Sequence, residues 1–149
     1  MRIVASLLMV VLSGCADYQF TVNERVVYTP APLFSDFDMP DEALRECVRT
    51  HIEEARATAA DQLDTLNCSH AGIVDLSGLQ VFTRLTRIKL SSNAIEEVNA
   101  LVDMTALIEL YLDDNALKRV SELRDLVELR LLDLAGNPAL RCSELETFR

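Results

Sequence analysis

The sequence Leu107-Ile108-Glu109-Leu110-Tyr111-Leu112-Asp113-Asp114-Asn115 decides the fold, because its pattern LxxLxLxxN occurs three times at a fixed spacing. The other two full copies begin 22 residues before it, at Leu85, and 22 residues after it, at Leu129. A fourth, degenerate copy begins at Leu63 and has Cys68 in place of the third Leu. Self-similarity at this period predicts a solenoid of stacked repeats, each of which buries its apolar face only against its neighbours.

The period, the consensus and the position of the Asn together resemble the leucine-rich repeat family, specifically its 22-residue, internalin-like bacterial class. The resemblance implies an α/β fold, namely a right-handed leucine-rich repeat solenoid with an N-terminal helical cap and a short parallel sheet. Residues 63–149 would contain four copies, the last of them short. The family binds partners through the concave face of its sheet, so the resemblance implies a site there.

The side chains of each repeat divide between the core and the concave surface. Alternate residues of a strand point to opposite faces, so the two Leu of LxL are expected inward and their neighbours outward. Across the turn, the core should be completed by Ile95, Val98, Leu101, Met104, Leu117, Val120, Leu123 and Leu126. In the last copy, Leu145 and Phe148 occupy equivalent positions within a short helix expected over 143–149. We expect the repeated asparagines to stack as a ladder and to bond backbone groups at the turns, a structural role. They are Asn93, Asn115 and Asn137.

Residues 39–62 are expected to cap the open end of the first repeat. A helix is predicted over 40–59, with Asp38 near its N-cap and Pro40 in its first turn. Its apolar stripe at helical spacing would cover the first repeat. The stripe consists of Leu44, Cys47, Val48, Ile52, Ala55 and Ala59.

Residues 40–47 (Pro-x-x-Ala-Leu-x-x-Cys) and 66–69 (Leu-Asn-Cys-Ser) resemble the N-terminal cap of small envelope repeat proteins. Cys47 lies on the apolar stripe and Cys68 at an inward position of the first strand, so we predict a disulfide between them in an oxidising compartment. Cys142 falls at a core position and is expected to be a buried free thiol. The alternative is a zinc site made by these three cysteines and a His, although the sequence has no CxxC pair.

Residues 1–14 have the features of a lipoprotein signal peptide. The apolar run over 3–12 is too short to span a bilayer as a helix. Residues 12–15 (Leu-Ser-Gly-Cys) resemble a bacterial lipobox, which implies cleavage before Cys15 and acylation of Cys15 as the lipid anchor. Ala16 directly after the anchor favours sorting to the outer membrane, facing the periplasm. The alternative is an ordinary secreted protein in which Cys15 is incidental.

Residues 15–38 would then form a lipid-anchored tether. Two β-prone runs, 18–22 and 26–28, flank a turn and predict a hairpin. Pro30 and Pro32 stiffen the remainder. The hairpin is interpreted either as part of a spacer that lifts the repeats off the membrane or as a strand pair packed on the N-terminal edge of the solenoid.

Composition and charge exclude several classes of partner and chemistry. Acidic residues outnumber basic ones 24 to 14, and a net charge of -10 repels the phosphates of nucleic acids. We expect neither a nucleic-acid partner nor a cofactor. The only histidines, His51 and His70, have no catalytic partner that the sequence identifies, so we do not expect an enzyme. A calcium site at Asp113, Asp114 and Asp133 would lack the spacing of a dedicated oxygen-rich loop.

The expected partner-binding site lies on the outward side chains of neighbouring strands. It consists of Arg87, Lys89, Glu109, Tyr111, Asp113 and Asp133. Strands lie about 4.8 Å apart, so Arg87 should face Glu109 and Lys89 should lie beside Tyr111. The sequence therefore predicts a membrane-anchored envelope protein that binds another protein, with Tyr111 as an aromatic anchor. The alternatives are a glycan-binding or peptidoglycan-binding module, a structural envelope component, and a solvated face whose charges neutralise one another.

Overall fold

The computed structural model describes residues 20–22 and 25–148, and the chain divides into two units after Pro32. In the first unit, β1 (Phe20–Val22) pairs antiparallel with β2 (Arg25–Tyr28). The expected signal peptide and Cys15 lie outside the described residues. No helix in the described part of the chain has the length and apolar character needed to cross a membrane.

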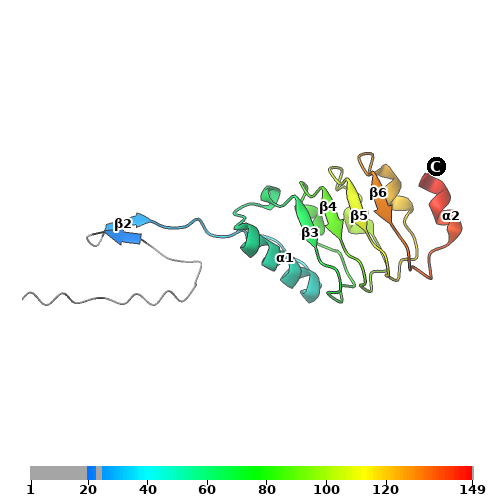
Figure 1. Ribbon diagram of the computed structural model, residues 1–149, viewed down its shortest axis with the longest axis horizontal. Coiled ribbons are helices and arrows are strands. Elements are labelled where there is room, and N and C mark those ends of the chain that lie inside the picture. Colours follow the sequence, from blue (N-terminus) through cyan, green and yellow to red (C-terminus); the bar gives the residue numbers. More distant parts are fainter. Residues whose placement is uncertain (1–19, 23–24, 149) are drawn as a thin grey trace, which may run out of the picture. The chain divides into compact units, whose positions relative to one another are not determined.

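The second unit is built around a four-stranded parallel sheet (Figure 1). Its strands follow the chain in order: β3 (Thr65–Asn67), β4 (Arg87–Lys89), β5 (Glu109–Tyr111) and β6 (Leu131–Asp133). The register between neighbours is one repeat, so Ile88 lies between Leu66 and Leu110. The architecture is therefore the predicted α/β solenoid with a short parallel sheet.

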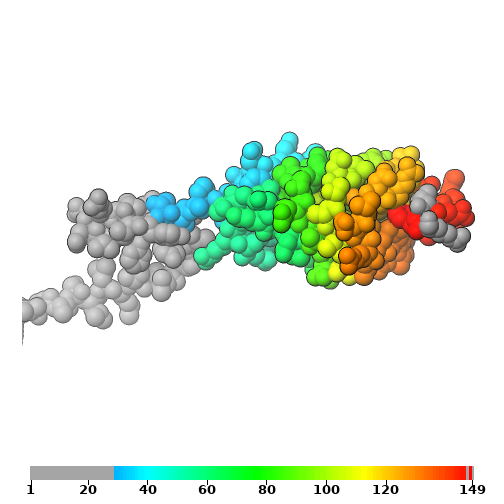
Figure 2. Space-filling model, turned by 90° about the horizontal axis from the view of Figure 1, so that it is seen from above, coloured from blue at the N-terminus to red at the C-terminus, as the bar shows by residue number. Residues whose placement is uncertain are grey.

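The core fills the space between the sheet and the convex side of the solenoid. The inward strand residues Leu66, Ile88 and Leu110 are each at most 2% exposed. The convex side is formed by short 3-10 helices at Leu79–Val81, Asn99–Leu101 and Ser121–Asp125. The apolar residues predicted on this side, from Ile95 to Leu126, are all buried. Figure 2 shows the successive repeats packed as adjacent bands.

The three repeated asparagines form the predicted structural ladder. Asn115 Oδ1 accepts the N–H of Ile95 at 3.1 Å, and Asn115 Nδ2 donates to the carbonyl oxygen of Leu90 at 2.9 Å. Both partners belong to the preceding repeat. Asn93 and Asn137 repeat the arrangement one unit earlier and one unit later. Each repeat therefore supplies hydrogen-bond partners that its neighbour needs.

The cap helix α1 is shorter than predicted, spanning Glu42–Ala55 rather than 40–59. Its N-cap is Asp41 and not Asp38, because the Asp41 carboxylate accepts a backbone N–H of the first turn at 3.0 Å. The helix ends where Arg56 takes a left-handed conformation with φ 51°. The buried face consists of Leu44, Val48 and Ile52. The last two positions of the predicted stripe are not buried, since they lie at or beyond the end of the helix.

Residues 33–38, which the sequence analysis places in the tether, pack against the N-terminal end of the solenoid. The rings of Phe34 and Phe37 lie 5.9 Å apart between centroids, and both contact the ring of Phe82 in the first repeat. Met39, the next apolar residue, is fully buried. The cap therefore begins with an extended apolar segment before α1.

The C-terminal segment forms α2 (Cys142–Leu145) and a 3-10 turn (Glu146–Phe148). The prediction that Cys142 is buried is wrong, because its side chain is exposed. Leu145 and Phe148, at positions equivalent to core residues of the earlier repeats, are 43% and 38% exposed.

The last repeat departs from the repeat path at Pro138. In the repeat before it, Ala116 follows the ladder asparagine and donates its N–H to the carbonyl oxygen of Ile95 at 3.0 Å. Pro138 stands at the equivalent position and has no N–H to donate. The chain after Pro138 therefore lacks this hydrogen bond, and α2 follows at positions where the two preceding repeats have 3-10 helices.

Candidate binding face on the concave sheet

Arg87 and Glu109 form a forked ion pair across β4 and β5. Arg87 Nε donates to Glu109 Oε2 at 2.6 Å, and its second guanidinium nitrogen donates to Oε1 at 2.8 Å. The hydrogen bond from Arg87 lowers the pKa of Glu109 below its ordinary value, against the opposing effect of burial. The same bond raises the pKa of Arg87. Both groups are therefore charged at neutral pH and held in one geometry.

Tyr111 stands beside this pair on β5. Its hydroxyl donates to Glu109 Oε2 at 3.3 Å, and Lys89 Nζ lies 5.2 Å from the centre of its ring. Burial and the nearby charge of Glu109 raise the pKa of Tyr111, which keeps the phenol protonated. The ring is thus fixed at one end by a carboxylate and covered on one face by a cation.

Asp113 lies two residues after β5, and Asp133 is the last residue of β6. Asp113 Oδ1 accepts the hydroxyl of Ser91 at 2.6 Å, and Asp133 Oδ1 accepts the N–H of Ala135 at 3.1 Å. Asp114 points toward the neighbouring repeat, where a Cβ at Gly136 would lie 2.0 Å from its Oδ1. Asp113 and Asp133 therefore bond neighbouring groups at strand ends and turns of the solenoid.

The structure brings the predicted site residues together on one sheet. The register places Arg87 beside Glu109, and it places Tyr111 between Lys89 and Asp133. Sequence reasoning missed the part played by Ser91, although Ser91 stands one repeat before Asp113. Ser91 and Asp113 are 22 residues apart, so the repeat period could have predicted that their side chains are neighbours.

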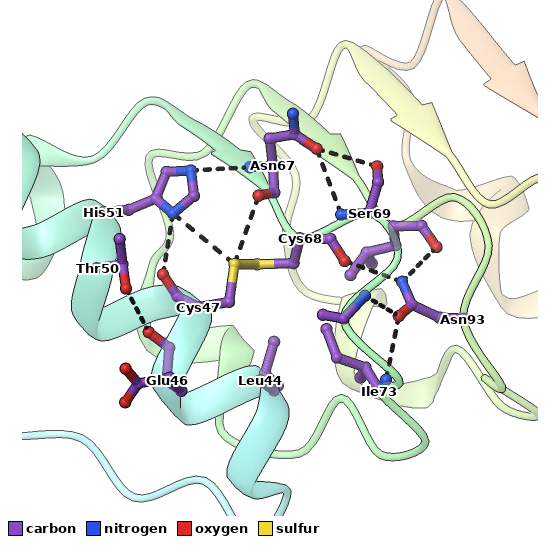
Figure 3. Close-up of a disulfide and its surroundings, with 12 residues drawn as sticks. Leu44, Glu46, Cys47, Thr50, His51, Asn67, Cys68, Ser69, Ile73 and Asn93 are labelled. Carbon is purple, nitrogen blue, oxygen red and sulfur yellow. Dashed lines mark hydrogen bonds between the residues drawn. A yellow bond between two sulfur atoms is a disulfide. The ribbon is translucent and has the colours of Figure 1, made fainter.

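The cap holds the predicted disulfide between Cys47 and Cys68, whose Cα atoms lie 5.8 Å apart (Figure 3). His51 lies beside it on α1. His51 Nε2 accepts the N–H of Asn67 at 3.2 Å, so Nδ1 carries the proton and donates to the carbonyl oxygen of Cys47 at 2.9 Å. Within the described residues this is the one cluster with metal-ligand spacing. Its sulfurs are joined to each other and its imidazole is occupied, so the cluster serves as a covalent and hydrogen-bonded staple for the cap.

Residues 83–138 match the family model described as leucine rich repeat. The fold is that of the leucine-rich repeat proteins. An internalin (inlF) from Listeria monocytogenes is 24% identical, with a TM-score of 0.65 over 73% of this chain and 34% of that chain. Internalin C2 (inlC2) from the same organism is 26% identical, with a TM-score of 0.63 over 73% of this chain and 51% of that chain.

The chain aligns with about half, or less, of the length of each of these internalins. The comparison with curated proteins gave no significant match. The likenesses support the leucine-rich repeat solenoid described above.

Proposed function

We propose that this chain is a membrane-anchored protein of the bacterial cell envelope that binds another protein through its concave sheet. The carrying observation is the group formed by Arg87, Glu109, Tyr111 and Lys89 on β4 and β5, which we name the concave cluster. It presents an aromatic ring, a guanidinium and an ammonium outward from a rigid sheet. Tyr and Arg are the residue types that most often dominate the energy of protein interfaces.

The order within the concave cluster favours binding over a merely solvated face. Each side chain is already held by a neighbour, so a partner would lose little further side-chain entropy in contacting it. The Arg87 side chain is 48% exposed while forming both hydrogen bonds, which leaves part of its guanidinium accessible. Lys89 covers one face of the Tyr111 ring, which reduces the ring surface available for stacking a sugar. A protein partner is therefore preferred to a glycan.

The test is a pull-down from native envelope extract with the full-length chain and two charge-reversal variants. Arg87→Glu changes the concave cluster. Lys118→Glu is the control, because it breaks another exposed ion pair, with Glu96, that also joins two neighbouring repeats but lies outside the strands. We expect a protein retained by the parent and by Lys118→Glu to be lost with Arg87→Glu. The same protein, once purified, should bind the parent directly and lose affinity with Tyr111→Ala.

The double variant Arg87→Glu/Glu109→Arg separates recognition from stability. It keeps an ion pair of the same kind on the sheet, so its thermal unfolding should match that of the parent. Loss of the partner by this variant would identify the individual charges as the recognised feature. Equal retention by the parent and by every variant of the concave cluster would contradict the proposed site. Binding to purified peptidoglycan, lost with Tyr111→Ala, would favour the glycan alternative.

The anchor is tested at Cys15. The parent should fractionate with membranes and incorporate labelled fatty acid, whereas Cys15→Ser should do neither. Separation of inner and outer membranes would then test the expected outer-membrane location. A parent that stays in the periplasmic fraction without label would contradict the anchor and leave the concave site unaffected.

A further inference from the structure

The two ends of the solenoid differ in how they are closed. At the first end, α1 and the segment before it cover the core, and His51 accepts the edge N–H of Asn67. At the other end, a cavity of about 560 Å³ lies between the last repeat and the C-terminal turn. Nine of its eleven lining residues are apolar, and the two others are Arg124 and Arg130. We name this surface the open end.

The backbone at the open end also has unused hydrogen-bonding capacity. In β4 and β5, the residue after the strand donates its N–H to the next strand, as Leu112 does to the carbonyl oxygen of Asp133 at 2.8 Å. Leu134 is the equivalent residue after β6, the outermost strand of the sheet. Its N–H has no acceptor among residues 20–22 and 25–148. An edge strand of this kind is a template for association.

The residues that enter β6 carry a self-complementary pattern. The sequence Val127-Glu128-Leu129-Arg130-Leu131 is apolar at its ends and centre, with an acid before Leu129 and a base after it. Val127 is 81% exposed and Leu131 is 39% exposed. Neither Glu128 nor Arg130 has an ion-pair partner in the described part of the chain. Val127 and Glu128 form a turn that leads into β6, and a second copy related by a two-fold axis would match this segment in both charge and apolar contacts.

We infer that the open end binds a second copy of this chain, related by a two-fold axis near Leu129. Val127 then lies against Leu131 of the partner subunit, and Glu128 lies against Arg130 of the partner subunit. The two-fold axis repeats each contact, so one five-residue segment supplies two ion pairs and two apolar pairs. The contact also covers part of the apolar cavity, which reduces the free energy of the exposed surface.

The charge pattern selects a second copy over an unrelated strand. An edge strand alone would accept many partners, but an acid and a base placed symmetrically about one residue are matched by the same segment running in the opposite direction. The net charge of -10 on each copy opposes association at long range. At about 0.15 M salt the screening length is about 8 Å, so the local pairs act while the long-range repulsion is reduced.

The test is sedimentation equilibrium of the full-length chain in a nonionic detergent at about 0.15 M salt. We expect a concentration-dependent dimer that Glu128→Arg and Arg130→Glu each weaken by about tenfold, because like charges then face each other. The double variant Glu128→Arg/Arg130→Glu restores opposite charges across the axis and should recover dimerisation to within about threefold of the parent. Val127→Asp should weaken the dimer, while Val74→Asp, at an exposed position of the first repeat, should not.

Circular dichroism and thermal unfolding of each variant check that the fold is kept, and neither Glu128 nor Arg130 has an ion pair to lose within the described residues. Recovery by the double variant would establish the two-fold contact. The inference is overturned if the parent stays monomeric at all concentrations or if the single variants leave the affinity of the dimer unchanged. It is also overturned if the double variant dimerises no more tightly than the single variants. Leu131 is the register neighbour of Glu109 in the sheet, so the concave cluster is tested separately by its own variants Arg87→Glu and Tyr111→Ala.

Discussion

Asn115 joins two repeats through one buried side chain. Its Oδ1 accepts the Ile95 N–H of the preceding repeat, and its Nδ2 donates to three carbonyl oxygens, at Leu90, Leu112 and Asp113. Asn115 is 6% exposed, so water cannot replace these bonds. The Asn amide accepts a hydrogen bond through its oxygen and donates hydrogen bonds through its nitrogen. An ionised Asp could only accept and a Leu could do neither, which explains why Asn holds the position.

We predict that Asn115→Ala lowers the free energy of unfolding by about 1–3 kcal/mol, because the N–H of Ile95 and the carbonyl of Leu90 lose a buried partner. The measurement is urea unfolding followed by circular dichroism. Asn99→Ala is the matched control, since the Asn99 side chain is exposed and, among the described residues, bonds only Glu97. Equal losses in the two variants would contradict the ladder's energetic role.

Asp41 connects the cap helix to the first repeat and makes stability depend on pH. Its carboxylate accepts N–H groups of Leu44, Val74 and Asp75. Burial acts to raise its pKa, but these backbone hydrogen bonds outweigh burial and lower the pKa below the ordinary value of 3.8. A lowered pKa in the folded state means that the contribution is complete above the unfolded value and disappears as pH falls through the folded value.

We therefore predict that Asp41→Asn lowers the free energy of unfolding by about 1–2 kcal/mol at pH 7, and that the parent and the variant converge as pH falls below about 4. Urea unfolding at a series of pH values measures the difference. Asp38→Asn is the control, because the Asp38 carboxylate has no hydrogen-bond partner in the described residues. A difference between parent and Asp41→Asn that stays constant down to pH 2 would refute the linkage.

The sequence does not determine which of these two aspartates is the N-cap of α1. Asp38 and Asp41 both precede the apolar stripe and both suit an N-cap. The choice depends on the N–H groups of Val74 and Asp75, which come from a loop 33 and 34 residues away in the sequence. Local patterns predict that a cap exists, whereas its position follows from a tertiary contact.

Among the elements, the segment before α1 approaches the first repeat most closely at Gly78. A Cβ there would lie 2.2 Å from the carbonyl oxygen of Asp38 and 2.8 Å from the Met39 side chain. Gly78 has φ +95°. Gly72, in the same repeat, has φ +80° but has nothing within 4 Å of its Cβ position. Substitutions at the two glycines therefore distinguish the effect of backbone strain, present at both, from the effect of close packing by the cap, present only at Gly78.

We predict that Gly78→Ala destabilises the protein more than Gly72→Ala. Both variants incur the cost of a positive φ, about 1–2 kcal/mol, and only Gly78→Ala also forces the cap segment away from the repeat. Thermal unfolding measures the difference, and limited proteolysis between residues 33 and 41 should accelerate only in Gly78→Ala. Equal effects of the two substitutions would show that the approach of Asp38 adds nothing.

The strands were predictable because a fixed period determines register. Once Leu85, Leu107 and Leu129 are aligned, each outward residue has its neighbour in space, which is why the Arg87–Glu109 pair could be predicted. The ends of the solenoid follow no such period. Packing of Phe34 and Phe37 on Phe82 depends on an extended segment without repetition, and the expected burial of Cys142 extrapolated the repeat beyond Pro138.

For the molecule as a whole, stability is the sum of contacts between neighbouring repeats and the cap. The disulfide joins α1 to the end of β3 across 21 residues of sequence. Closing a loop of that length is expected to stabilise the folded chain by about 3 kcal/mol in the chain-entropy account. Since β3 pairs with β4 on one side and contacts α1, the stabilisation by the disulfide should be greatest at that end of the solenoid.

We predict that Cys47→Ser/Cys68→Ser lowers the midpoint of thermal unfolding. It should also reduce hydrogen-exchange protection more in α1 and β3 than in β5. Cys142→Ser is the control, because Cys142 is an exposed free thiol and its loss should leave both measurements unchanged. Uniform loss of protection across all four strands would contradict the local action of the disulfide and indicate a single cooperative unit.

The concave cluster was predictable as a set of positions but not as a network. The repeat places Arg87, Lys89, Glu109 and Tyr111 on one face, as expected from alternation along each strand. Sequence does not determine that the Tyr111 hydroxyl turns to Glu109 or that Lys89 covers the ring, since both depend on side-chain rotamers. The identity of the partner depends on chemistry outside this chain.

The unequal closure of the two ends gives the solenoid one direction in which it can grow. A further 22-residue unit placed after β6 would meet the N–H of Leu134, which has no acceptor in the described part of the chain, and a surface lined mostly by apolar residues. A unit placed before β3 would have to displace α1 and break the bond between Cys47 and Cys68. Duplication of a repeat could therefore lengthen the concave sheet from the C-terminal side while the cap and everything attached to it stay unchanged.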